Sequence, residues 1–170
     1  LMNRSVVNLG FSGHGLMQPA VAQLLSEVQA AAYVLDCEVN MDKYTPSSSA
    51  GSQRNHTVVE TLTYAFVKQL CAARPETPVL LIEGHDYTPG WAEINGMDKQ
   101  AGTRNGYRAA YARIQSEGDT GVYYLNGSGK MGGPIATDIE AQAGPVAGVH
   151  VTDFAFWHFA RYVGGALDRI

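Results

Sequence analysis

The segment Val6-Val7-Asn8-Leu9-Gly10-Phe11-Ser12-Gly13-His14-Gly15 is the most informative one for the fold, because it joins a β-branched apolar run to a turn rich in small residues. Apolar side chains then recur at helical spacing, at Met17, Val21, Leu24, Leu25 and Val28. A strand, a small-residue turn and a helix in this order direct backbone N–H groups at one point above a parallel sheet. The stretch therefore predicts a site for an oxyanion or a phosphate at this turn.

The rest of the chain continues the alternation of strand and helix. Periodicity predicts strands over residues 4–9, 32–37, 79–83 and 122–125. Helices are expected over residues 17–29, from a capping box at Thr57 to just before Pro75, from a cap at Thr103 to Gly118, and from Thr152 onward. With no hairpin signal, this order predicts a single α/β domain over residues 1–170, with helices on both faces of a parallel sheet.

Composition and charge narrow the function classes. Of the 170 residues 45% are hydrophobic and 16% are charged, the net charge is −4, and no apolar run approaches a membrane span. We therefore expect no membrane span and no nucleic-acid partner. Cys37 and Cys71 lack the spacing of metal ligands and are expected to be buried free thiols. The sequence predicts neither a metal site nor a cofactor.

Three loops are expected to meet at the carboxyl edge of the sheet: residues 10–15, 38–42 and 148–153. They bring backbone N–H groups, the Ser12 hydroxyl, the Asn40 carboxamide and the His150 imidazole. Backbone N–H groups with a carboxamide can form an oxyanion hole, and a neighbouring histidine can act as a general base. A fourth loop, residues 84–102, carries Tyr87 and Trp91, which either line a substrate pocket or pack the loop against the domain.

The motifs for phosphate binding are missing. The turn after the first predicted strand fits neither the dinucleotide-binding nor the P-loop pattern. It is not a G-x-S-x-G nucleophile elbow either, because His14 stands in the last glycine position. A phosphate or nucleotide binder would rest on fold analogy alone.

Three segments resemble successive blocks of the SGNH (GDSL-like) hydrolases: Asn8-Leu9-Gly10-Phe11-Ser12-Gly13, Tyr33-Val34-Leu35-Asp36-Cys37 running to Asn40-Met41, and Gly148-Val149-His150 with Thr152 to Phe156. The resemblance covers nearly the whole chain. It implies a flavodoxin-like α/β/α sandwich with a mostly parallel sheet of four to five strands, and hydrolysis of carboxylic esters. It also implies that Gly13 and Asn40 form the oxyanion hole and that His150 is the catalytic base.

The chain departs from that family at two points. The block that supplies the nucleophilic serine precedes the Asn-Leu-Gly block in the family, and it is not in this chain. The acid normally found three residues before the histidine is replaced by Ala147. A main-chain carbonyl, or Asp138 or Glu140 upstream in the same loop, could orient His150 instead. Asp153 is expected to compensate the N-terminus of the last helix.

The missing block leaves a physical problem in the sheet. Without the family's first strand, two strands would face each other across roughly 10 Å with unpaired backbone groups. Either a longer parent chain or a partner fragment supplies that strand, or the strand over residues 4–9 moves inward. The inward move would place Ser12 in the nucleophile position, facing His150.

The sequence therefore favours an ester hydrolase for a small-molecule substrate, acting on acyl or acetyl esters that include carbohydrate esters. Its nucleophile is Ser12 or a serine upstream of Leu1. The alternative is a catalytically inactive binding or interaction domain, which Ala147 and the missing block favour.

Overall fold

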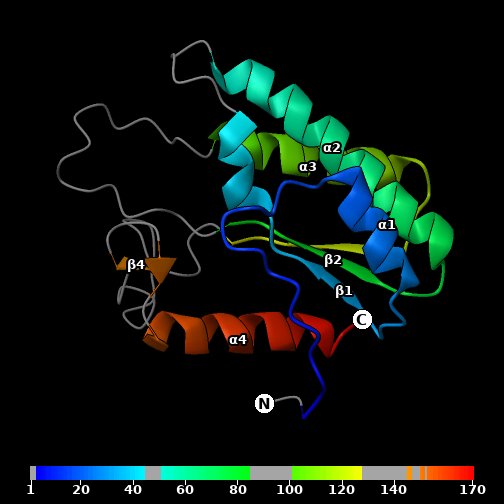
Figure 1. Cartoon of the computed structure of the whole chain (residues 1–170), viewed down its shortest axis with the longest axis vertical. Coiled ribbons are helices and arrows are strands. Elements are labelled where there is room, and N and C mark those ends of the chain that lie inside the picture. The colour runs from blue at the N-terminus through cyan, green and yellow to red at the C-terminus, as the bar shows by residue number, and fades with distance from the viewer. Residues whose placement is uncertain (1–2, 45–50, 85–100, 128–144, 147–149, 152) are drawn as a thin grey trace. The chain divides into compact units, whose positions relative to one another are not determined.

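The computed structural model describes residues 3–44, 51–84, 101–127, 145–146, 150–151 and 153–170 (Figure 1). The chain divides into two compact units. One contains Leu9–Glu83 and Lys99–Tyr124, and the other contains Leu1–Asn8, Gly84–Asp98 and Leu125–Ile170. We refer to them as the sheet unit and the terminal unit.

A parallel sheet organises the described part of the chain. Its strands lie in the order β1 (Tyr33–Leu35), β2 (Val79–Ile82) and β3 (Val122–Leu125). β1 and β2 are parallel, with Tyr33 opposite Val79 and Leu35 opposite Leu81. Helices α2 (Gly51–Ala73) and α3 (Ala101–Ser116) make the two crossovers and pack against each other. The predicted α/β class is confirmed.

The core lies between the sheet and the helices of the sheet unit. Helix α1 (Pro19–Glu27) packs on α2 and adds the fully buried Ala22 to this core. Val79 and Leu81 of β2 belong to the same cluster, together with Val67 of α2 and Ile114 of α3. All four positions of β2 are buried, as expected for the inner strand of a sheet.

Two predicted helix starts are wrong. Thr57 and Thr103 both lie inside their helices, because α2 begins at Gly51 and α3 at Ala101. Thr103 is fully buried and its hydroxyl donates to Glu38, so tertiary contact, not capping, explains that threonine. The predicted end of α3 is confirmed: Gly118 adopts φ +89°, a left-handed conformation that stops a helix after its last turn.

The predicted strand over residues 4–9 is also wrong. Residues 3–11 carry no regular secondary structure, and Val6 and Val7 are 84% and 69% exposed. β-branched residues form a strand only when a neighbouring strand pairs with their backbone. No described strand pairs with this segment.

The terminal unit contains a short hairpin and the last helix. β4 (Pro145–Val146) and β5 (His150–Val151) pair antiparallel, where a loop without hairpin signal was expected. Helix α4 (Asp153–Leu167) follows directly, and Asp153 lies in its first turn as predicted. In the described ranges, no helix has both the length and the apolar character needed to cross a membrane.

A buried carboxylate marks the carboxyl end of β2. Glu83 is fully buried and accepts hydrogen bonds from Arg108 Nε at 2.7 Å and Nη2 at 2.9 Å, and from Tyr124 Oη at 2.5 Å. Burial, then the bond to Glu83, raises the pKa of Tyr124, so the phenol stays protonated and donates. This network ties β2 to α3 and β3.

Gly106 and Gly165 give opposite predictions for the same substitution. Alanine normally stabilises a helix interior relative to glycine by about 1 kcal/mol. A Cβ at Gly106 would lie 2.7 Å from the His56 carbonyl oxygen and 2.7 Å from Val59 Cβ, so Gly106→Ala should destabilise the chain. At Gly165 the nearest such atom is Arg169 Nη1 at 3.9 Å, so Gly165→Ala should stabilise it. Urea unfolding of both variants measures the change in unfolding free energy that each substitution causes. Changes of the same sign in the two variants would contradict this account of α2–α3 packing.

Removing the Glu83 carboxylate should destabilise the fold more than removing one of its donors. Glu83→Ala leaves the Tyr124 hydroxyl without its acceptor and opens a cavity, at a cost of about 3 kcal/mol in unfolding free energy. Tyr124→Phe removes one hydrogen bond and keeps the pair with Arg108, so about 1.5 kcal/mol is expected. If urea unfolding gives Tyr124→Phe the larger effect, the carboxylate is not the centre of this network.

Candidate functional site

Asn40 lies in a short helix directly after β1. Residues Glu38–Tyr44 form the 3₁₀ helix η1, where the sequence predicted an irregular loop. The Asn40 N–H donates to the Cys37 carbonyl at 3.0 Å, which closes the first turn. Glu38 and Met41 are fully buried while Asn40 is half-buried, so its neighbours hold the turn and leave its side chain at the surface of the unit.

The attachment of η1 to the rest of the unit is partly polar. The Thr103 hydroxyl of α3 donates to the Glu38 carboxylate inside the protein. On the other side of the turn, Met41 belongs to the main core and its sulfur accepts from the Thr63 hydroxyl of α2 at 3.8 Å. A polar and an apolar anchor therefore fix η1 to both crossover helices.

The glycine-rich segment forms a tight turn before α1. The His14 N–H donates to the Phe11 carbonyl at 2.7 Å, and Gly13 has φ +70°. A type II turn requires a positive φ at its third residue, which is Gly13 in this turn. This requirement explains why that residue is a glycine. The imidazole Nδ1 of His14 lies 2.9 Å from the Ser12 carbonyl oxygen and braces the same turn.

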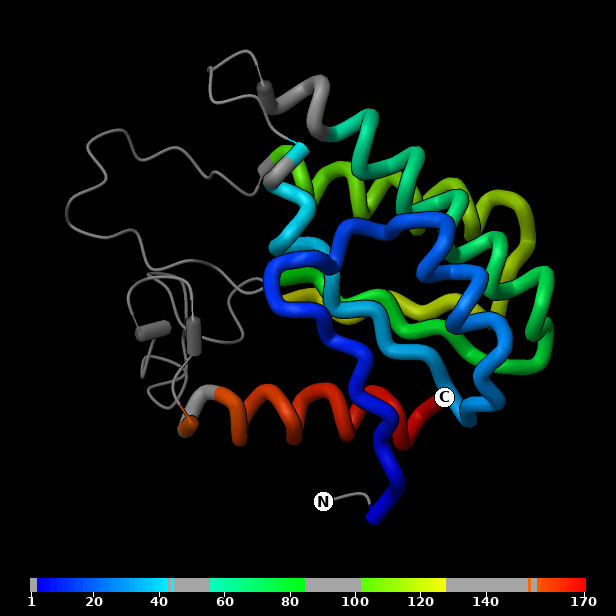
Figure 2. Tube along the Cα trace, in the orientation of Figure 1, coloured from blue at the N-terminus to red at the C-terminus, as the bar shows by residue number. Residues whose placement is uncertain are grey.

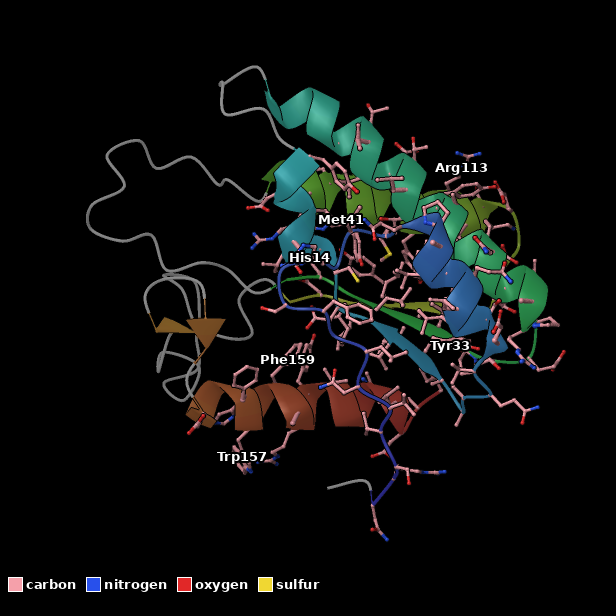
Figure 3. All side chains as sticks on the ribbon, viewed as in Figure 1. His14, Tyr33, Met41, Arg113, Trp157 and Phe159 are labelled. Carbon is pink, nitrogen blue, oxygen red and sulfur yellow. The ribbon has the colours of Figure 1, made fainter. Side chains whose placement is uncertain are left out.

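The two segments meet, as the sequence predicted for their loops. The Gly15 N–H donates to Asn40 Oδ1 at 3.0 Å, and the Tyr44 hydroxyl donates to the Leu16 carbonyl at 3.2 Å. Figure 2 shows the trace passing η1 on its way into α1, and in Figure 3 the labelled neighbours His14 and Met41 lie at this junction. Since the carboxamide oxygen faces Gly15, its NH₂ group points away from Gly15.

Cys37 lies beside this junction but is a poor nucleophile. Burial, reinforced by the nearby Asp36 carboxylate, raises the pKa of the thiol to about 12. A thiol with that pKa stays protonated near neutral pH, and the thiolate is the reactive form. Cys37 and Cys71 are both free, as predicted, but they are half-buried where the sequence predicted full burial.

Ser12 lies on the exposed side of the turn. Its assignment as nucleophile depended on an inward-moved strand over residues 4–9, and that strand is not formed. The role of Ser12 as the nucleophile therefore stays a prediction, and the inward-moved strand no longer supports it. The position of Gly13, two residues before the hydrogen-bonded Gly15, is consistent with the predicted oxyanion hole, although its role is likewise still a prediction.

The remaining predicted site residues belong to other parts of the chain. The backbone of His150 lies in β5 of the terminal unit, so its convergence with Asn40 stays a prediction. Tyr87, Trp91, Ala147, Asp138 and Glu140 lie outside the described residues. Within the described ranges, the His, Cys, Asp and Glu side chains form no group of three that could hold a metal ion.

Sequence reasoning missed the residues that hold the site together. Gly15, Glu38 and Thr103 are contributors that periodicity could not identify, because their partners are 25 to 65 residues away in the chain. A signal was present for Glu38: a carboxylate directly after a buried strand must find a partner or reach solvent.

Known proteins share this fold. A structure described as a GDSL-like lipase from Bacteroides ovatus matches with a TM-score of 0.71 and 20% identity, over 92% of this chain and 41% of its own. The salicylyl-acyltransferase SsfX3 of a tetracycline biosynthetic pathway matches with a TM-score of 0.65 and 21% identity, over 91% of this chain and 42% of its own. The likeness confirms the flavodoxin-like α/β fold. The chain spans about two fifths of the length of either structure.

The sequence itself gives the family. The comparison with curated proteins finds no match. A model of the GDSL-like lipase/acylhydrolase family, in contrast, matches residues 1–167, which is nearly the whole chain. With that match and the shared fold, this chain belongs to the GDSL-like lipase/acylhydrolase family.

Proposed function

We propose that this chain carries the oxyanion hole and the general base of a serine esterase for small acyl or acetyl esters, including carbohydrate esters. Family membership supports acyl-ester chemistry in general. The observation that carries the finer proposal is the hydrogen bond from Gly15 to Asn40, because it joins the glycine turn and the Asn40 carboxamide at one point of the sheet unit.

In the proposed reaction His150 takes the proton of a serine hydroxyl, and the serine oxygen attacks the ester carbonyl. The Gly13 N–H and the Asn40 NH₂ group donate to the oxyanion of the tetrahedral intermediate. As the intermediate collapses, the alcohol leaves with the proton from His150 and an acyl-enzyme remains. Water, deprotonated by His150, then releases the acid and restores the serine.

The position of Asn40 supports the donor role. A donor contributes most to catalysis when it is held in place before charge develops. Asn40 meets that condition through the buried Glu38 and Met41 on either side of it and through the Gly15 N–H on its oxygen. The carboxamide therefore needs little reorganisation when the oxyanion forms.

Replacing the proposed donor should reduce turnover without unfolding the chain. Asn40→Ala should lower kcat for a p-nitrophenyl acetate assay by about 10²–10³-fold, since one such donor stabilises the transition state by roughly 3 kcal/mol. Asn105→Ala, at an exposed position of α3, is the matched control and should keep full turnover. Unchanged kcat in a folded Asn40→Ala variant would remove Asn40 from the mechanism.

A covalent probe tests the serine and separates an enzyme from a binding domain. A fluorophosphonate probe should label the purified 170-residue chain at Ser12 if that hydroxyl is the nucleophile, and peptide mapping identifies the adduct. Ser12→Ala should then abolish labelling, while Ser26→Ala, at a half-buried serine near the end of α1, should not. A folded chain that takes no label speaks against Ser12 and favours a nucleophile elsewhere or the binding-domain alternative.

A further inference from the structure

We propose that Gly15 is a positioning residue that sets the orientation of the Asn40 carboxamide through its backbone N–H and its lack of a side chain. The proposal rests on the function proposed above, in which the Asn40 NH₂ group donates to the oxyanion. It adds a residue outside the predicted site, two positions beyond the turn glycine Gly13.

The first part of the argument concerns the two ends of a carboxamide. Its oxygen and its NH₂ group have nearly the same shape, so packing alone distinguishes them poorly. If the side chain turned over, the oxygen would face the developing oxyanion and repel it. The Gly15 N–H, 3.0 Å from Asn40 Oδ1, favours one orientation because a donor can pair with the oxygen but not with the NH₂ group.

The second part concerns why the residue is glycine. Among the described glycines, Gly13 and Gly118 have positive φ and Gly15 does not, so its backbone conformation is open to other residues. Space is the constraint: a Cβ would lie 3.1 Å from Asn40 Oδ1, 3.2 Å from Cys37 Cα and 3.2 Å from Cys37 Sγ. Cys37 Cα is backbone that follows β1 and cannot give way easily. A methyl group would therefore push the segment away from η1 and lengthen the bond to Asn40.

The third part concerns what holds Gly15 against η1. Two positions later, Met17 is 2% exposed and has φ +50°, a conformation that non-glycine residues adopt only when their surroundings impose it. Between them, the Leu16 carbonyl accepts from the Tyr44 hydroxyl at the far end of η1. The core and η1 thus fix the segment on both sides of Leu16, which gives the Gly15 N–H a defined direction.

A double-mutant cycle tests whether Gly15 acts through Asn40. In the full chain, Gly15→Ala should lower kcat for p-nitrophenyl acetate by about 10–100-fold with KM within about twofold, because the loss falls on the transition state. In the Asn40→Ala background the same substitution should cost almost nothing more. Gly121→Ala, where no atom lies within 4 Å of the added Cβ, is the control and should keep full turnover.

A second measurement does not depend on activity. Amide hydrogen exchange followed by NMR should show that the Gly15 amide exchanges at least about tenfold faster in Asn40→Ala, because it loses its acceptor. In Gly15→Ala the side-chain amide resonances of Asn40 should shift, while those of Asn105 should stay in place.

The outcomes separate this proposal from the proposed function. If the unsubstituted chain hydrolyses no ester but the exchange and resonance changes occur, the positioning contact stands and an esterase with Ser12 as its nucleophile is contradicted. The positioning role would be overturned if the reductions in kcat caused by Gly15→Ala and by Asn40→Ala multiplied in the double variant. Unchanged Asn40 resonances in a folded Gly15→Ala variant would overturn it as well.

Discussion

Burial of Glu38 and Met41 on either side of Asn40 is the constraint on which the candidate site depends. A buried carboxylate needs a hydrogen-bond donor, and α3 provides one from Thr103. A buried thioether needs apolar surroundings, and the core beneath α2 provides them. Because the crossover helices meet both requirements, their contacts fix the position of η1, the short helix that carries Asn40.

The glycine segment completes this arrangement from the opposite direction. It reaches α1 through a turn with Gly13 in the left-handed region and through a buried Met17 in the same region. Both features restrict the path of the chain, and the path brings Gly15 against Asn40. The core therefore restricts the turn, and the turn restricts the orientation of a single carboxamide.

Membership of the GDSL-like lipase/acylhydrolase family fits this arrangement, because acyl chemistry requires fixed donors around a carbonyl oxygen. The solved structures of similar fold are more than twice as long as this chain, and one of them is an acyltransferase by its description. Hydrolysis and acyl transfer share the same acyl-enzyme and differ in the acceptor. A fixed oxyanion hole serves either reaction equally. The choice of the acceptor therefore depends on the pocket around the oxyanion hole.

Local residue patterns predict the fold class, the strands 79–82 and 122–125 nearly to the residue, the end of α3 at Gly118, and the meeting of the glycine-rich loop with the loop that carries Asn40. These features follow from local patterns and from the rule that parallel strands present their carboxyl ends together. The tertiary structure adds that residues 4–9 form no strand, that Thr103 is buried on Glu38, and that the atoms joining the two loops are the Gly15 N–H and Asn40 Oδ1. The physical reason is the same in each case: strand pairing, burial of a carboxylate and close backbone approach depend on partners distant in the chain, which periodicity along the sequence does not record.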